Sequence, residues 1–145
     1  TYGNQATPLI FKNGNTTGFQ FLSYAGLLQS VTMDLGNTVE YRELVGATSA
    51  KEVLITDRAA NGSVSIEAIL TATKDYFAAA LADGSLGNLQ FLHGTTAGNK
   101  VQLISSKVDI GDVAYGELQG VAMLEIPYTL VPSTAGNDEF SLIYT

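Results

Sequence analysis

Apolar residues alternate with polar ones along most of this chain, and short turn-forming segments separate the alternating stretches. Val31, Met33 and Leu35 share one side of a segment whose other side carries Thr32 and Asp34. This two-residue period is typical of a half-buried β-strand. Charged residues make up only 14% of the chain, compared with about 25% in ordinary globular chains. The pattern predicts strands and turns rather than helices.

The alternation and the turn residues together predict two hairpins and further strands. Gly36-Asn37 is expected to join strands at residues 31–35 and 38–44, because glycine and asparagine accept the positive φ angles of tight turns. Asn61-Gly62 is expected to join residues 51–57 and 63–70 in the same way. Further strands are expected at residues 19–24, 88–93, 100–110, 115–131 and 139–144. A phase change near Ser105 predicts a bulge, and Pro127 predicts an edge position or a bulge.

One segment departs from the two-residue period. Residues 73–83 are rich in alanine, and apolar side chains recur there at helical spacing. Thr71 or Thr73 is expected to cap the helix, and Asp75 suits its first turn. The resulting order of strands, one helix and strands differs from a parallel α/β fold. It predicts a mainly β fold, an antiparallel β-sandwich or small barrel with one flanking α-helix at about residues 73–83.

Charge and composition limit the functions open to the chain. Its formal net charge of −7 argues against nucleic-acid binding driven by Lys and Arg, and against docking on anionic lipid. It leaves open a surface past which nucleic acid slides. The chain has no cysteine, and so no disulfide, thiolate nucleophile or cysteine metal site. We therefore expect no membrane partner, no cofactor and no metal.

Residues that could carry catalysis are few. His93 is the one histidine, and no nucleophile or orienting group can be assigned to it, which favours a structural role. Residues 94–100 resemble a phosphate-binding loop, but the glycine spacing differs from that motif and a strand is expected to follow. A β-hairpin loop is the better interpretation. We predict no enzyme activity.

Two acidic pairs have the residue type of calcium ligands. Asp109 with Asp112, and Asp138 with Glu139, supply fewer carboxylates than a calcium loop needs. Solvated turn residues are the better interpretation. A carboxylate pair for glycoside hydrolysis stays open as a minor alternative.

A distributed feature indicates assembly instead. Apolar residues occur on strand faces that should point to water, and a contiguous patch of this kind implies a partner. These residues are Ile69, Leu92, Val121, Met123 and Val131. With the low charge, they predict a homo-oligomer whose subunits pair edge to edge. Asp57 and Arg58 are expected to form an ordinary surface ion pair, and an ion pair across the subunit interface is the alternative, which makes both residues candidate interface residues.

Several segments resemble the tail tube (major tail) proteins of long-tailed bacteriophages. They are Leu35-Gly36-Asn37-Thr38-Val39, Val53-Leu54-Ile55-Thr56-Asp57-Arg58, Ala72-Thr73-Lys74-Asp75-Tyr76-Phe77, His93-Gly94-Thr95-Thr96-Ala97-Gly98-Asn99-Lys100, Gln119-Gly120-Val121-Ala122-Met123 and Asn137-Asp138-Glu139. The resemblance covers residues 31–145, which form the expected tail-tube-like β domain. Residues 1–30 are expected to be an N-terminal arm or the remnant of a longer chain.

This resemblance implies a fold and a role. The family is related in fold to the tube proteins of type VI secretion, and its members stack rings around a channel. The rings are usually hexameric, and some relatives with two fused tube domains form trimers. The resemblance also implies an acidic channel through which DNA passes, tape-measure and tail-tip proteins as partners, and a place in the virion tail after synthesis in the bacterial cytoplasm.

Two other functions remain open at this point. A β-sandwich module of a virion or bacterial surface protein, binding carbohydrate or a receptor, predicts a stable monomer or trimer and a groove with exposed aromatic side chains. The chain has seven tyrosines and no tryptophan, which makes such a groove a weaker expectation. A hydrolase would need a cleft that holds His93 and a carboxylate.

Overall fold

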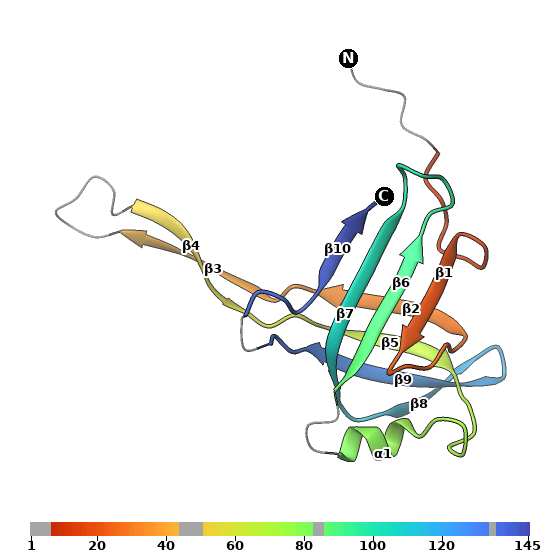
Figure 1. The fold of residues 1–145 in the computed structure, drawn as a ribbon. Coiled ribbons are helices and arrows are strands. Elements are labelled where there is room, and N and C mark those ends of the chain that lie inside the picture. Colours follow the sequence, from red (N-terminus) through yellow and green to blue (C-terminus); the bar gives the residue numbers. More distant parts are fainter. Residues whose placement is uncertain (1–6, 44–50, 83–85, 134–135) are drawn as a thin grey trace.

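The computed structural model describes residues 7–43, 51–82, 86–133 and 136–145. Within them, antiparallel strands dominate and a single short helix lies between β5 and β6 (Figure 1). The mainly β fold class with a flanking helix is thus confirmed. The elements are β1 Thr16–Phe21, β2 Leu28–Asp34, β3 Asn37–Glu43, β4 Lys51–Arg58, β5 Asn61–Glu67, α1 Tyr76–Leu81, β6 Gly87–His93, β7 Val101–Ile110, β8 Ala114–Leu118, β9 Val121–Leu130 and β10 Ser141–Tyr144.

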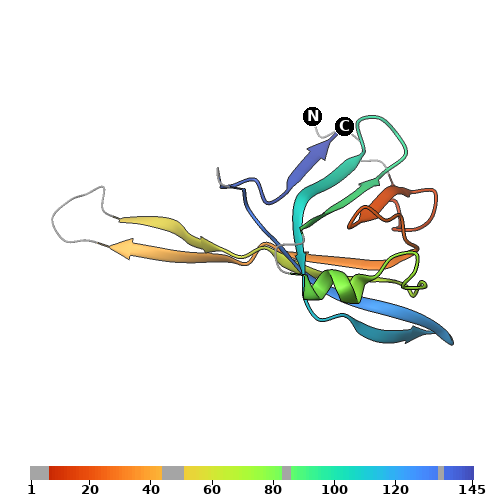
Figure 2. The same ribbon diagram turned by 60° about the horizontal axis from the view of Figure 1, so that its bottom comes forward.

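The main sheet divides into two halves at β7. Its order is β1-β6-β7-β9-β5-β2, with β10 added to β7 and β8 added to β9. β10 pairs with residues 101–104 of β7, whereas β9 pairs with residues 108–110 of the same strand. One half therefore contains β1, β6, β7 and β10, and the other contains β2, β5, β9 and β8. The strands of the two halves run in different directions (Figures 1 and 2). The sheet does not close into a barrel, because β1 and β2 lie at opposite ends of its order.

The hydrophobic core lies between the two halves. Its fully buried members include Phe21 and Leu89 from one half and Val64 and Ile126 from the other. Complete burial of each such side chain contributes roughly 1.5–3 kcal/mol. Along β9, Leu124, Ile126, Tyr128 and Leu130 face this core, as their alternation predicts.

Two tyrosines connect the core to the helix and to the sheet. The ring of Phe21 contacts the rings of Tyr76, from α1, and Tyr128, from β9. The Tyr128 hydroxyl donates a hydrogen bond to the Thr32 carbonyl at 2.7 Å. Burial raises the pKa of Tyr128 to about 12, and burial with a smaller effect of Tyr24 raises the pKa of Tyr76 to about 12.

The predicted bulge in β7 is confirmed. Gly87 of β6 lies opposite Val108, but Leu89 lies opposite Ser105, so β7 carries an extra residue between these pairs. This irregularity allows Ser105 and Val108 to face the core despite their odd spacing. The buried Ser105 hydroxyl donates a hydrogen bond to the Glu139 carbonyl at 2.6 Å.

The helix is shorter than predicted. It begins at Tyr76 and ends at Leu81, and Asp75 caps it by accepting a hydrogen bond from the Ala78 amide at 2.9 Å. The expected caps Thr71 and Thr73 are therefore wrong, because residues 71–73 form a turn before the helix. The end expected at residue 83 lies outside the described residues.

The two hairpins predicted from Gly36-Asn37 and Asn61-Gly62 are wrong. β2 pairs with β5, and β3 pairs with β4, so the chain does not reverse at either segment. Gly36-Asn37 leads from β2 into β3, and Asn61-Gly62 begins β5. Gly36 has a φ of +56°, and a Cβ at this position would lie 2.4 Å from the Ala59 carbonyl oxygen. Glycine is therefore needed at position 36 because the backbone of Ala59 approaches it closely, not because the chain reverses there.

The single strand predicted at residues 115–131 is also wrong, because β8 and β9 form a hairpin there. Gln119 and Gly120 have φ angles of 52° and 84°, as a tight two-residue turn requires. Pro127 lies on β9, which is not an edge strand. Along β9, the pairing with β8 ends at Glu125 and the pairing with β7 begins at Tyr128. Pro127 therefore lies in the gap between these two neighbouring strands. A residue without an amide hydrogen is tolerated in such a gap.

Residues within the predicted N-terminal arm contribute to the body. β1 pairs with β6, and Phe21 and Leu22 are buried in the core. The division of the chain at residue 30 into arm and domain stays a prediction.

Candidate assembly surfaces

The strands β3 and β4 form a separate ribbon that projects from the body of the molecule (Figures 1 and 2). Val39 lies opposite Ile55, and Tyr41 lies opposite Val53. Directly opposed residues share one face of an antiparallel pair. We call these four residues the apolar ribbon face. Their exposed fractions are 58% for Val39, 59% for Tyr41 and Ile55, and 67% for Val53.

The other face of the ribbon is mostly polar. Arg42 forms an ion pair with Glu52, and both side chains are about half exposed, with Glu40 on the same face opposite Leu54. The ribbon is therefore amphipathic, although it projects into solvent in a single copy. Isolated two-stranded ribbons are marginally stable in water, and a large exposed apolar patch marks an interaction surface.

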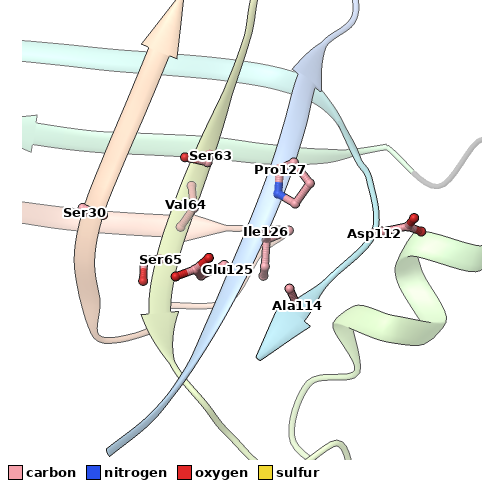
Figure 3. Close-up of a pocket in the computed structure, with 9 residues that line it drawn as sticks. All are labelled: Ser30, Ser63, Val64, Ser65, Asp112, Ala114, Glu125, Ile126 and Pro127. Atoms are coloured by element: carbon pink, nitrogen blue, oxygen red, sulfur yellow. The ribbon is translucent and has the colours of Figure 1, made fainter. Parts of the chain in front are cut away.

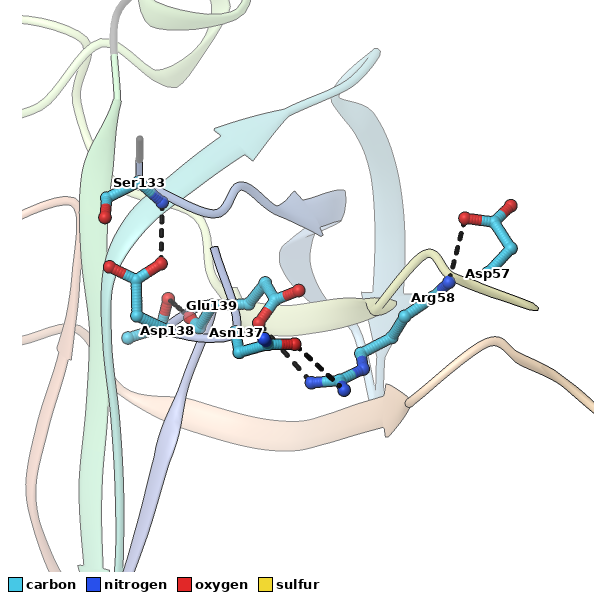
Figure 4. Close-up of polar contacts among 7 residues, drawn as sticks. Asp57, Arg58, Ser133, Asn137, Asp138 and Glu139 are labelled. Carbon is cyan, nitrogen blue, oxygen red and sulfur yellow. Dashed lines mark hydrogen bonds and ion pairs between the residues drawn. The ribbon is translucent and has the colours of Figure 1, made fainter. Parts of the chain in front are cut away.

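The base of the ribbon is tied to the segment before β10 (Figure 4). One terminal nitrogen of Arg58 lies 3.6 Å from a Glu139 carboxylate oxygen, and the other donates a hydrogen bond to the Asn137 side chain at 3.3 Å. The Glu139 side chain is only 10% exposed, so Arg58 balances a nearly buried charge. Asp57 instead accepts a hydrogen bond from the Arg58 backbone amide at 2.8 Å. The role of Asp57 and Arg58 at a subunit interface stays a prediction.

Two of the acidic residues with the type of metal ligands, Asp138 and Glu139, have other partners. Asp138 accepts a hydrogen bond from the Ser133 amide at 2.7 Å, and hydrogen bonds from Ser133 lower the pKa of Asp138. Glu139 faces Arg58. Among the residues described, no group of three or more His, Cys, Asp or Glu side chains is placed to hold a metal ion.

The five apolar residues expected on outward faces differ in exposure. Val121 is 46% exposed, and Ile69, Leu92 and Val131 are partly buried. Met123 is only 5% exposed, so the expectation that it faces water is wrong. It lies opposite Glu67 and outside the core cluster, so it is on the outward side of β9, as its strand phase predicts. The participation of these five residues in a subunit interface stays a prediction.

A polar surface covers the outer side of β2, β5 and β9. The register aligns Ser30 with Ser65 and Glu125, Thr32 with Ser63 and Pro127, and Asp34 with Asn61 and Thr129. We call these nine residues the hydroxyl face. An open depression of 420 Å³ lies in it, lined by Ser30, Ser63, Ser65, Glu125 and Pro127 together with Val64, Ile126, Asp112 and Ala114 (Figure 3). None of the residues that line it is aromatic.

Several donors of the hydroxyl face are bonded within the sheet. The Thr32 and Ser63 hydroxyl oxygens lie 2.8 Å apart, and the Thr32 hydroxyl also accepts a hydrogen bond from the Ser63 backbone amide at 3.0 Å. The Ser65 hydroxyl donates to the Gln29 side chain at 2.8 Å, and the Asn61 side chain donates to the Ala59 carbonyl at 2.8 Å. These donors are therefore turned along the sheet rather than offered to a ligand.

His93 has a structural environment. Its Nδ1 lies 2.9 Å from the Thr16 hydroxyl, its Nε2 lies 3.2 Å from the Leu9 carbonyl oxygen, and its ring stacks on Phe11. The loop that follows joins β6 to β7, and the Lys100 amide donates to the Thr145 carbonyl at 2.8 Å. This is the β-hairpin loop that the sequence favours over a phosphate site. No helix in the described part of the chain is long and apolar enough to cross a membrane.

Comparisons with known proteins give structural similarity only. No family model and no curated protein matches the chain. A chain in the virion of a native gene transfer agent particle is 18% identical, with a TM-score of 0.48 over 83% of this chain and 85% of that one. A chain in the tail of an empty gene transfer agent particle, refined with C6 symmetry, is 16% identical, with a TM-score of 0.41 over 83% of each chain.

Proposed function

We propose that this protein is a structural subunit of a phage tail tube and that its copies assemble into stacked rings around a channel for DNA. The observation that carries this proposal is the apolar ribbon face. More than half of each of its four side chains is exposed on an element that projects beyond the body. A second copy of the chain is the partner that covers this face.

The size of the apolar ribbon face indicates how much of the assembly it can support. Complete burial of such a side chain contributes roughly 1.5–3 kcal/mol. About three-fifths of each side chain is exposed, so covering all four contributes roughly 4–7 kcal/mol. Micromolar association requires about 8 kcal/mol beyond the cost of immobilising the partners. Stable rings therefore need a further contact between copies.

The open edges of the sheet supply that further contact. Within the described residues, β2 pairs only with β5, and β8 pairs only with β9. Every pairing in the order β8-β9-β5-β2 is antiparallel, so β2 and β8 run in opposite directions. If β2 of one copy meets β8 of the next, the joint is also antiparallel. A closed ring of such joints leaves neither β2 nor β8 as an open edge.

The other candidate functions are less well supported. A carbohydrate- or receptor-binding module needs a groove with exposed aromatic side chains, whereas serine, carboxylate, proline and small aliphatic side chains line the depression described here. A hydrolase needs His93 beside a carboxylate, but its ring nitrogens face Thr16 and Leu9. In the tube role, the partners are further copies, a tape-measure protein and tail-tip proteins, and the location is the virion tail.

Negative-stain electron microscopy of the concentrated protein tests the proposal. Rings or tubes are expected, with six copies in each ring as the resemblance implies. Light scattering on the same samples should give a mass that rises with concentration. Single copies at all concentrations, at near-neutral pH and moderate salt, would contradict the proposed function.

A further inference from the structure

We propose that the hydroxyl face lines the channel of the tube. This inference rests on the proposed function and adds to it the surface that faces the DNA. It follows from three independent features of the described residues: the charge of the strands, their hydrogen bonding and the position of the body relative to the sheet.

The charge of the four strands suits a surface that passes DNA. β2, β5, β8 and β9 contain no lysine or arginine, and Asp34, Glu67 and Glu125 lie on the side of the hydroxyl face, whereas Glu117 lies opposite Ala122 on the other side. The affinity of proteins for DNA comes largely from contacts of Lys and Arg with phosphates. A wall built from these strands therefore repels the phosphates and has no basic side chain to hold them.

The hydrogen bonding of the face also limits adhesion. Neutral hydroxyl and amide donors can bind phosphate oxygens without any positive charge. On this face, the Thr32 and Ser63 hydroxyls bond to each other, and the Ser65 hydroxyl donates to Gln29. Several hydroxyl donors of the face are therefore already engaged, which leaves fewer of them for a passing phosphate.

The position of the body decides which side of the sheet faces inward. The other side of β2, β5 and β9 packs on the core, and the second half-sheet lies beyond it, with α1 flanking β8 (Figures 1 and 2). When the halves of neighbouring copies join through β2 and β8, they form a closed wall. The inside of a closed wall has less room than the outside. The bodies must therefore lie outside, which leaves the hydroxyl face inside.

The dimensions are compatible with this arrangement. Four strands at a spacing of about 4.8 Å give roughly 19 Å of wall for each copy. Six copies, the number that the resemblance implies, then enclose a cylinder about 37 Å across before side chains are counted. Such a channel is wide enough to pass a DNA duplex.

Cysteine labelling tests the inference, because the natural chain has no cysteine. Ser63→Cys places a thiol on the hydroxyl face, and Ala78→Cys places one on the exposed side of α1, beyond the core. Each variant is treated, as single copies and as assembled tubes, with a small maleimide and with a maleimide on a long polyethylene glycol chain. In tubes, Ser63→Cys should keep its reaction with the small reagent and lose its reaction with the large one. Ala78→Cys should keep both.

The other outcomes are distinguishable. If Ser63→Cys in tubes reacts with the large reagent as fast as Ala78→Cys, the face lies outside, and the inference is overturned. If it reacts with neither reagent, the face is buried between copies, which also overturns the inference. Thr129→Cys, on the same face, repeats the test if Ser63→Cys does not assemble. If the unsubstituted chain forms no tubes, the proposed function fails, and the inference fails with it.

Discussion

Replacing Val53 and Ile55 with threonine should weaken assembly and leave the single copy folded. Both substitutions keep the β-branched shape that suits a strand, and they exchange apolar surface for hydroxyl groups. Val53 is 67% exposed and Ile55 is 59% exposed, so the fold of one copy depends little on them. Covering the new hydroxyls in a docked apolar face forfeits about 1 kcal/mol at each site. The two sites together give about 2 kcal/mol, or a roughly 30-fold higher concentration for assembly.

Sedimentation velocity over a concentration series measures this shift. The matched control is Glu40→Gln, which changes the other face of the same ribbon, opposite Leu54. The control should assemble at the concentration of the unsubstituted chain, and circular dichroism should show the same thermal unfolding for all three proteins. Equal assembly of the threonine variant and the unsubstituted chain, with both folded, would refute the role of the apolar ribbon face.

Three further predictions concern the base of the ribbon and the core. Arg58→Met leaves the nearly buried Glu139 carboxylate without its cation and should lower the free energy of unfolding by about 1–2 kcal/mol. Arg42→Met breaks an exposed pair and should lower it by less than about 1 kcal/mol. Denaturant titration compares the two variants, and equal losses would count against the anchoring of the ribbon base. Gly36→Ala places a Cβ against the Ala59 carbonyl oxygen at positive φ and should lower the free energy of unfolding by at least about 2 kcal/mol. Gly98→Ala, at positive φ in open space, should lower it by about 1 kcal/mol. Thermal unfolding measures both losses, and a Gly36 variant as stable as the Gly98 variant would disprove the close approach. Tyr76 and Tyr128 have pKa values raised from 10.0 to about 12, so the folded state keeps their phenols protonated. The stability that they contribute should be complete below pH 10 and should fall as the pH rises to about 12. Urea titrations at increasing pH test this, and Tyr128→Phe should reduce the pH dependence of stability.

Most strand positions follow from the sequence but, apart from the β6–β7 hairpin, the pairing of the strands does not. Alternation of apolar residues places β5, β6 and β7 correctly, because a half-buried strand leaves a two-residue period in any sheet. It even locates the bulge beside Ser105, where the period slips. The partner of each strand depends on contacts distant in sequence. Asn61-Gly62 has the composition of a turn, yet it lies within β5 opposite Thr129 and Tyr128 of β9.

The candidate surfaces were harder to predict than the core, for a related reason. Val39, Tyr41, Val53 and Ile55 show the same alternation as the buried residues of β5 and β9, so the sequence does not reveal that their strands leave the body. Met123 shows the opposite case. Its phase correctly predicts the outward side of β9, but it is buried on that side of the sheet. The hydroxyl face becomes visible only when the register aligns serines and threonines from three separated strands.

The central claim is that another copy of this chain covers the apolar ribbon face. A photo-crosslinking amino acid in place of Tyr41 tests it directly, in assemblies mixed from light and heavy isotope-labelled copies. Mass spectrometry should find crosslinks of mixed isotopic composition that join position 41 of one copy to the body of another. Crosslinks only within one copy, or none in samples that contain tubes, would contradict the claim.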